Sequence, residues 1–537
     1  MEETFSLTDV EGELLATVER SHASLSDETP FQVLLLGDWS GRENRGLTVS
    51  SAELGEWRPR IVDRDNLNQV MARLGVKLRI PLASNGSPSL TITFDQLDDF
   101  HPDQLFRRLD IFESLAQTRS KLNNPKTFQE AAAEVRGWSE VAASERSRVE
   151  PARARVSEDP PPAPHSGGSL LDEILARGTD ASSGDSSSAA GHQPPEVSPE
   201  IFELAKAAVK NHLAPDVEEE RDQLIAAVDA RIATTMRAIL HDPHFQALES
   251  SWRALDLLVS RLDTGNELRL HILDISFEEF RADLHSDKDF RNIAIYKLLV
   301  EQTIGTPGGI PWAVVAGNYI FDLADGDSGL IEPVSMIARA ARAPFIFGTT
   351  ARLLGCQSLF ETPDPDDWQV LDPQIEEWWE GIINLPSAAY VGFALPRFLL
   401  RLPYGRNTEP TEEFAFEEIG DANAKMTAEA QHESYLWANP AFGVAFLLAK
   451  GFGESGWAFR PSDSLEIEGL PLHIYKSRDG DTEIKPCAEV LLTVRAAKKM
   501  IDRGLMPLLS MKESDTVRLG MVQSIAGTQL AGPWNEH

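Results

Sequence analysis

The segment that says most about the fold is residues 395–405, Leu-Pro-Arg-Phe-Leu-Leu-Arg-Leu-Pro-Tyr-Gly. Two X-Pro steps bracket an apolar stretch, and an arginine lies on each side of the core of that stretch. Each proline fixes its own φ and pushes the preceding residue toward extended geometry. The string therefore predicts a short, rigid and buried segment.

Composition limits the classes of protein to which the chain can belong. Its 537 residues are enough for two or more domains, and 42% apolar residues are typical of a globular protein. Acidic residues outnumber basic ones 84 to 50, for a formal charge of −34. Such a surface repels nucleic acid and anionic membrane, so we expect neither as a partner.

The number of cysteines and the N-terminal sequence indicate the cellular compartment. Cys356 and Cys487 are too few for a disulfide framework and are predicted to be buried thiols. The first residues lack the basic and apolar regions of a signal peptide, and no apolar run is long enough to span a bilayer. We therefore expect a cytoplasmic protein without membrane insertion.

The apolar periodicity and the local composition divide the chain into three parts. Residues 1–138 contain a buried strand at 31–36, two alternating strands and a helical stripe at 103–122, and are predicted to form a small α/β unit. Residues 139–198 are rich in Pro, Ser and Gly and are predicted to be a disordered linker. A capped amphipathic helix is predicted inside it at 169–178.

Residues 199–537 are predicted to form a larger domain. Helical and strand patterns alternate along it, which favours a mixed sheet covered by helices and an α+β fold class. Its predicted strands are 268–275, 312–321, 344–348, 389–395 and 472–475, and its predicted helices include 199–260, 288–304, 330–343, 373–382 and 432–451.

Patterns that could carry chemistry are weak. Gly451 to Gly456 is a literal G-x-G-x-x-G, but a helix-like run precedes it where a dinucleotide site needs a strand, so a helix end is the better interpretation. His241 and His244 flank a proline, which disrupts a metal-binding face and favours a corner between helices. We find no nucleophile elbow or Cys-His arrangement, and predict no enzyme activity, cofactor or metal.

As a whole string, residues 395–405 resemble the signature of the large subunit (TssC, also EvpB) of the type VI secretion contractile sheath. The signature residues are Leu395, Pro396, Arg397, Arg401, Pro403, Tyr404 and Gly405. Further strings of this resemblance are Phe245 to Arg253, Gly305 to Gly309, Gly317 to Phe321, Leu436 to Asn439, Glu468 to Pro471 and Lys485 to Val490. They extend the resemblance through most of residues 200–524.

A second resemblance, to the small sheath subunit (TssB), covers roughly residues 28–138. It rests on Pro30 to Gly41, Ile61 to Asn68 and Phe94 to Asp103, in the order and spacing that the family shows. The chain thus looks like a fusion of both subunits, with a contractile-sheath architecture similar to that of phage tail sheaths.

The resemblance implies a structural role. In that family the two subunits build a helical tube around an inner tube protein, contraction drives the inner tube outward, and an AAA+ ATPase recycles the sheath. The predicted partners are therefore sheath subunits (copies of this chain or full-length small and large subunits), the inner tube and the ATPase.

The linker helix is a predicted partner site. Its apolar edge is typical of helix-in-groove recognition, and it resembles the element of the large subunit that the AAA+ ATPase grips. The residues concerned are Leu170, Leu171, Asp172, Glu173, Ile174 and Leu175. Packing of this helix on residues 199–537 of the same chain is the alternative.

The chain stops earlier than the large subunit normally does, so the resemblance implies that the large-subunit domain at 199–537 is C-terminally truncated. We then expect the usual exchange of strands between subunits to be incomplete, and the protein not to form long tubes alone. Two alternatives to a sheath subunit stay open: a non-polymerising adaptor, cap or regulator of the sheath or baseplate, and an enzyme that uses the loop at 451–456.

Overall fold

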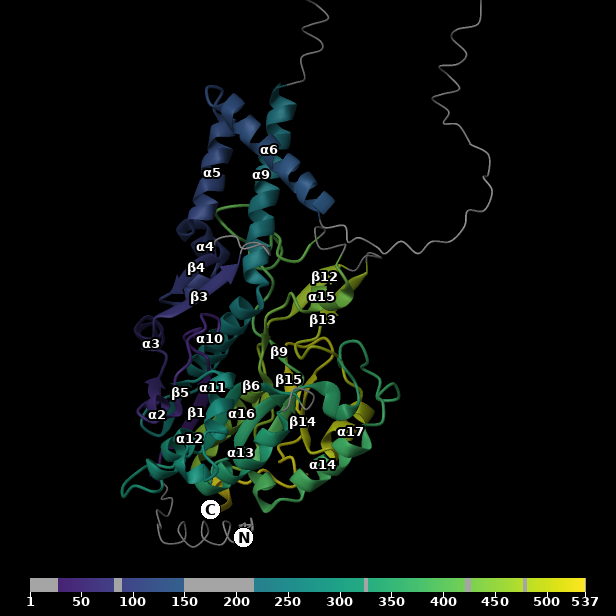
Figure 1. The fold of residues 1–537 in the computed structure, drawn as a ribbon. Helices are drawn as coiled ribbons and strands as arrows, with labels where there is room; N and C mark the ends of the chain where they lie inside the picture. Colours follow the sequence, from purple (N-terminus) through teal and green to yellow (C-terminus); the bar gives the residue numbers. More distant parts are fainter. Residues whose placement is uncertain are drawn as a thin grey trace, which may run out of the picture. The chain divides into compact units, whose positions relative to one another are not determined.

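The computed structural model describes residues 28–81, 89–148, 217–322, 327–420, 426–476 and 481–536. The described chain divides into two compact units, one made of residues up to 114 together with 231–537, and one made of 115–230. Figure 1 shows the fold and labels many of its helices and strands.

A nine-stranded sheet forms the centre of the first unit. Its middle strands are parallel, while the strands at its edges run antiparallel to their neighbours. In spatial order the strands are β11 (Glu466–Ile467), β15 (Val517–Leu519), β14 (Leu505–Ser510), β8 (Val391–Leu395), β7 (Phe345–Thr349), β6 (Val314–Phe321), β1 (Phe31–Gly37), β5 (Leu268–Asp274) and β2 (Arg60–Val62).

Helices cover both faces of this sheet. One face carries α11 (Phe277–Leu284), α12 (Ala294–Tyr296), α13 (Ser328–Ala341) and α14 (Pro373–Ile383), whose apolar side chains join one core cluster. The opposite face carries α16 (Pro440–Ser455), with α10 (Pro243–Arg261) beside it. This is a mixed sheet between helices, so the predicted α+β class is confirmed.

Smaller elements complete the unit. Three two-stranded ladders pair β3 (Val76–Pro81) with β4 (Ser89–Phe94), β9 (Phe398–Leu399) with β10 (Trp437–Ala438), and β12 (His473–Lys476) with β13 (Thr482–Lys485). The remaining helices are α2 (Ser51–Leu54), α3 (Leu67–Leu74), α4 (Pro102–Arg108), α15 (Ala428–His432) and α17 (Val494–Asp502).

The second unit is helical. It contains α6 (Phe128–Arg148) and the parts of α5 (Asp110–Asn123) and α9 (Val217–Leu240) that fall between residues 115 and 230. Within it, Arg119 Nε lies 2.7 Å from Asp229 Oδ1, and Arg136 pairs with Glu220. Phe128, Val135 and Val228 are among its buried side chains.

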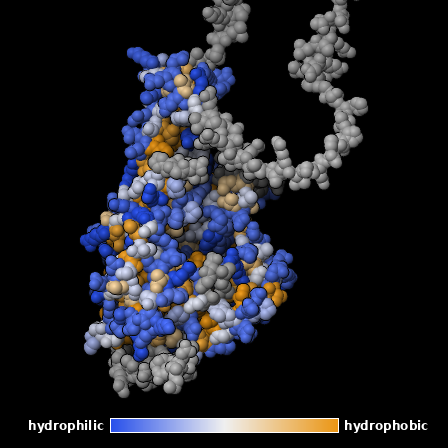
Figure 2. Space-filling model, in the orientation of Figure 1, coloured by the Kyte–Doolittle hydropathy of each residue, from blue (hydrophilic) through white to orange (hydrophobic). Residues whose placement is uncertain are grey.

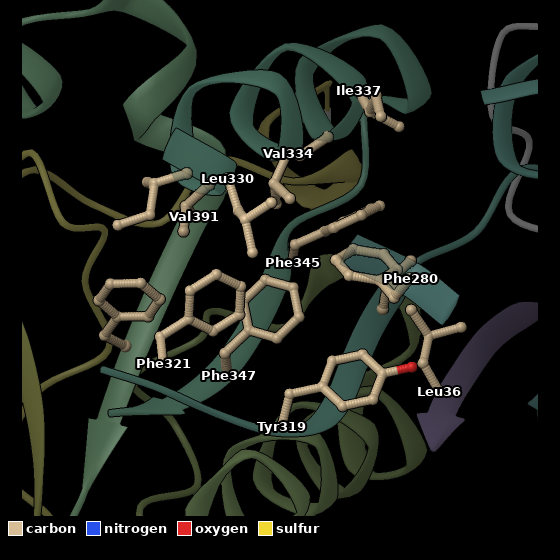
Figure 3. Packing of buried hydrophobic residues seen from close by; sticks show 14 of the residues in the cluster. Leu36, Phe280, Tyr319, Phe321, Leu330, Val334, Ile337, Phe345, Phe347 and Val391 are labelled. Atoms are coloured by element: carbon tan, nitrogen blue, oxygen red, sulfur yellow. The ribbon is translucent and has the colours of Figure 1, made fainter. Parts of the chain in front are cut away.

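Successive side chains of β1 point to opposite faces of the sheet, so this one strand packs against helices on both faces. Figure 3 shows Leu36 in the cluster that Phe280, Tyr319, Phe345 and other aromatic residues build beneath α13. Phe31, which points to the other face, stacks on Phe452 of α16 at 4.7 Å between ring centroids. All seven residues of β1 are buried, as expected of a central parallel strand.

Strand β1 connects the first predicted segment with the third. The predicted strand at 31–36 exists, but it pairs with β5 and β6 on its two edges, and both of those strands come from residues 199–537. Strands β1 and β2 of the first predicted segment therefore lie in one sheet with strands of the third, within the unit that contains residues up to 114 and 231–537. An apolar run shows that a strand is buried on both faces, but does not encode which strands lie beside it.

Polar contacts join the same two segments within the first unit. Arg42 donates two hydrogen bonds to the Glu279 carboxylate, at 3.0 and 2.9 Å, and lies 3.2 Å from Asp274. The Asp103 carboxylate accepts the backbone N–H groups of Glu412 and Glu413, at 2.9 and 3.1 Å. Ion pairs and hydrogen bonds to the main chain thus join the same two segments that contribute strands to the sheet.

The predicted linker is shorter at its start than expected, because α6 continues through residues 139–148. Residues 149–198, including the predicted helix at 169–178, lie outside the described residues. The predicted helix at 288–304 is replaced by short pieces, of which Lys297–Glu301 is a π-helix. The predicted helix at 432–451 is also wrong at its start, where β10 precedes α16.

A buried histidine gives the fold a specific dependence on pH. His271 in β5 is 8% exposed, and burial together with the charge of Arg269 lowers its pKa from 6.5 to about 4. The folded protein thus binds fewer protons than the unfolded chain between these pH values. We expect the free energy of unfolding to fall as pH drops from 6.5 to 4, by about 3 kcal/mol from this group.

Urea denaturation at pH 7.0, 5.5 and 4.5 measures this loss. The matched variant His271→Gln removes the titrating ring and should lose stability less steeply over the same interval. Equal slopes for the variant and the wild type would show that His271 does not titrate in this way.

Candidate functional site

The signature segment runs from the large sheet into a loop. Leu395 ends β8, the Leu395–Pro396 peptide bond is cis, and Phe398 and Leu399 form β9. Apart from half-buried Arg397, Leu400 and Leu402, every residue of the segment is buried. The prediction of a short buried segment is correct.

Arg401 is the centre of a buried ion-pair network. Its guanidinium lies 2.8 Å from Glu249 of α10 and 2.7 Å from Glu418. Arg401 is 5% exposed and both carboxylates are 0% exposed. Because a planar guanidinium can bind two carboxylates with separate N–H pairs, one arginine contacts both carboxylates here.

Tyr404 and Arg253 close this network. The backbone N–H of Tyr404 donates to Glu418 at 2.8 Å, and Arg253 donates to Glu249 at 2.7 Å and to the Tyr404 hydroxyl at 2.9 Å. Burial raises the pKa of Glu418, but the charge and hydrogen bonds of Arg401, together with His241 at 3.4 Å, outweigh it and lower the pKa to about 2. The Glu418 carboxylate is thus held in its ionised form at neutral pH.

Arg397 forms a second network, separate from the first. It donates to Glu489 at 2.8 and 2.5 Å and to Glu433 at 3.1 and 2.7 Å. Burial raises the pKa of Glu489, but Arg397 and a hydrogen bond from His432 outweigh burial and lower it to about 2. The two arginines of the signature therefore each bind a different pair of glutamates.

His432 connects this second network to a buried lysine. Lys485 Nζ donates to His432 Nδ1 at 2.7 Å, and His432 Nε2 lies 3.3 Å from Glu489. A neutral imidazole accepts at one nitrogen and donates at the other, which fits this order. Burial lowers the pKa of Lys485 to about 8 and also lowers the pKa of His432.

Three potential metal ligands meet here among the described residues. Ligand atoms of His432, Glu433 and Glu489 lie within 4.8 Å of one another. Arg397 already binds both carboxylates and Lys485 binds the free imidazole nitrogen, so a metal ion would have to displace both. The donor set fits an ion-pair network better than a metal centre.

The glycine-rich pattern and the histidine pair that the sequence analysis considered lie at a helix end and at a corner between helices. Gly451 lies within α16, and Gly456, with φ of 58°, ends that helix, as the helix-end interpretation predicted. His241 and His244 lie at the corner between α9 and α10, where Asp242 caps α10. The predicted ATPase-contact residues 170–175 lie outside the described residues.

Sequence reasoning missed the acidic partners of the signature. Glu249 lies in the string from Phe245 to Arg253, which the sequence analysis used only for the family resemblance. The spacing of Glu249 and Arg253, four residues apart on one helix, was the available signal. Glu418 lies in a loop without periodicity, so no local pattern marks it.

Two sequence profiles of known families match this chain. Residues 222–526 match the family described as EvpB/VC_A0108, tail sheath N-terminal domain. The chain belongs to this tail sheath family. Residues 15–139 match a second family, described as type VI secretion system, VipA, VC_A0107 or Hcp2, which confirms the resemblance of both segments.

A curated relative agrees with the larger match. The type VI secretion system sheath protein TssC1 of Pseudomonas aeruginosa is 33% identical over 319 residues, which are 58% of this chain. The chain spans 63% of the length of that relative. Strand β1 comes from the VipA-matched part and β5 and β6 from the tail sheath part, so the two family segments complete one sheet.

Replacing Arg401 tests the buried network. Arg401→Met leaves Glu249 and Glu418 without their shared cation, so we expect a loss of about 3–5 kcal/mol in the free energy of unfolding. Adding Glu418→Gln to that variant should restore part of the loss, because one uncompensated charge is removed. Chemical denaturation of each variant provides the measurement.

The matched control is Arg107→Met, since Arg107 pairs with Glu413 at 2.5 Å but is 48% exposed. We expect it to cost less than about 1 kcal/mol. Similar losses for Arg401→Met and Arg107→Met would contradict a structural role for the buried network.

Proposed function

We propose that this protein is a structural subunit of a type VI secretion contractile sheath that supplies both sheath segments in one chain. The observation that carries the proposal is that the VipA-matched and tail sheath-matched parts build one sheet, with β1 between β5 and β6. A single chain fixes the ratio of the two segments at one to one.

A structural role also fits the chemistry of the signature. Each of its two arginines is paired with carboxylates from distant parts of the chain. Such an arrangement fixes the positions of the loop at 403–418 and of α10 and needs no reacting group. We infer that the protein works through contacts between subunits and does not act as an enzyme.

The proposed partners are other sheath subunits and an inner tube protein. The face shown in Figure 2 is covered mainly by hydrophilic residues, with smaller apolar areas between them. With a formal charge of −34, the protein is suited to partners with basic surfaces and not to nucleic acid. Within the described part of the chain, no helix is long and apolar enough to cross a membrane.

Electron microscopy of mixed assemblies tests this function. The tagged protein is combined with complete sheath subunits and inner tube, and the tag is located with gold particles. We expect label along the whole length of the tubes. Label at tube ends alone would instead support a cap, and absence of label from all tubes would contradict both roles.

The same experiment has an internal control. Leu36 is 0% exposed near the C-terminal end of β1, so Leu36→Asp buries a charge and should abolish folding and incorporation.

We further propose that residues 170–175 bind the AAA+ ATPase that recycles the sheath. Leu171, Ile174 and Leu175 form an apolar edge in the sequence, beside Asp172 and Glu173. Leu171→Asp with Ile174→Asp should abolish ATPase binding in a pull-down while the melting temperature stays nearly unchanged.

Ala176→Asp is the control, because it adds a carboxylate off the apolar edge and should leave binding intact. A large drop in melting temperature for the double variant would favour packing of this segment on its own chain.

A further inference from the structure

A cavity of about 740 Å³ lies next to the second ion-pair network. It is bounded by α15, by the β12–β13 hairpin and by the loop that follows Pro403. Its volume falls within the range of sites that hold small organic molecules. The described residues that line it include Phe360, Tyr404, Ile419, Tyr435, Tyr475 and Lys485.

Lys485 provides a buried positive charge in the wall of this cavity. The residue is 7% exposed, and its ammonium lies among three aromatic rings, 4.8 Å from Phe360, 4.9 Å from Tyr435 and 5.6 Å from Trp437. Ring faces stabilise a cation but leave its N–H donors without a charged acceptor. An ammonium has three donors, and His432 Nδ1 is a neutral acceptor for one of them.

The neighbouring carboxylates do not serve as counter-ions in direct contact with Lys485. Arg397 binds Glu433 and Glu489 with four hydrogen bonds between 2.5 and 3.1 Å, and holds both carboxylates on its own guanidinium. Lys485 is therefore paired with an imidazole and aromatic rings in a place where a carboxylate would be the stronger partner.

The rest of the wall restricts the chemistry of a ligand. Among the described residues of the wall, the charged side chains besides Lys485 are Lys476 and Glu417, so a group with several negative charges would meet few donors there. The aromatic and aliphatic side chains of Phe360, Tyr435 and Ile474 suit an apolar body. A single carboxylate joined to an aromatic or branched apolar group satisfies both parts of the wall.

We propose that this cavity is a binding site for a monocarboxylate with an apolar body, with the carboxylate on Lys485 Nζ and the apolar body against Phe360 and Tyr435. This chemistry can come from a free organic acid or from an acidic, apolar segment of a second copy of the chain. It goes beyond the proposed sheath function, which requires no ligand.

The direct test uses the intact protein and 3-phenylpropanoate as the probe, with binding measured by isothermal titration calorimetry. We expect saturable binding to one site per chain. The neutral isostere 3-phenylpropanamide keeps the apolar body but loses the charge, so it should bind at least tenfold more weakly. Equal binding of acid and amide, or no binding of the acid at 10 mM, would overturn the proposal.

Variants locate the site. Lys485→Met keeps a similar shape without the charge and should weaken binding of the acid at least tenfold, whereas binding of the amide should change little. Lys476→Met is the matched control, because Lys476 is exposed on the same wall, and should change binding less than threefold. Weakening by Lys476→Met in place of Lys485→Met would contradict the assigned contact.

The comparison of acid and amide on the wild-type protein needs no variant, so it remains decisive even if Lys485→Met fails to fold. Sedimentation velocity distinguishes the two sources of the carboxylate. If a second copy supplies it, 3-phenylpropanoate should dissociate self-associated protein; if a free acid supplies it, the sedimentation coefficient should stay the same.

Discussion

The pairing of β1 on both edges is the constraint on which the rest of the structure depends. A strand buried on both faces has no water to satisfy its backbone, so its N–H and C=O groups need neighbouring strands. Those neighbours are β5 and β6, which come from the other family segment. Neither segment can complete this sheet alone, and the helices that pack on β1 depend on the same arrangement.

Buried ion-pair networks then fix the positions of the loops that the sheet does not constrain. The signature segment leaves the sheet at Leu395 and turns into loops, where backbone periodicity no longer specifies geometry. Arg401 and Arg397 fix those loops by binding glutamates that are distant in sequence, among them Glu249 and Glu489. A buried ion pair adds little net stability but is costly to break, so such networks define position more than they add stability.

Much of the fold followed from the sequence because its signals are local. The run at 31–36 and the strands near 345 and 391 are apolar and bounded by turns, and all of them are present. The partners of strands and side chains could not be predicted in this way. Neither the insertion of β1 between β5 and β6 nor the pairing of Arg401 with Glu418 produces a periodic pattern in the sequence. For the same reason the ion-pair networks were predicted only in part: the signature arginines were recognised, but their acidic partners were not.

Hydrogen exchange of the β1 amides tests the central claim most directly. If β1 is an integral strand of a shared sheet, peptides covering β1, β5 and β6 should exchange only on global unfolding, with the same free energy of opening. A β1 peptide that exchanges orders of magnitude faster than those of β5 and β6 would show that the N-terminal segment opens by itself. That result would contradict the account of one shared core.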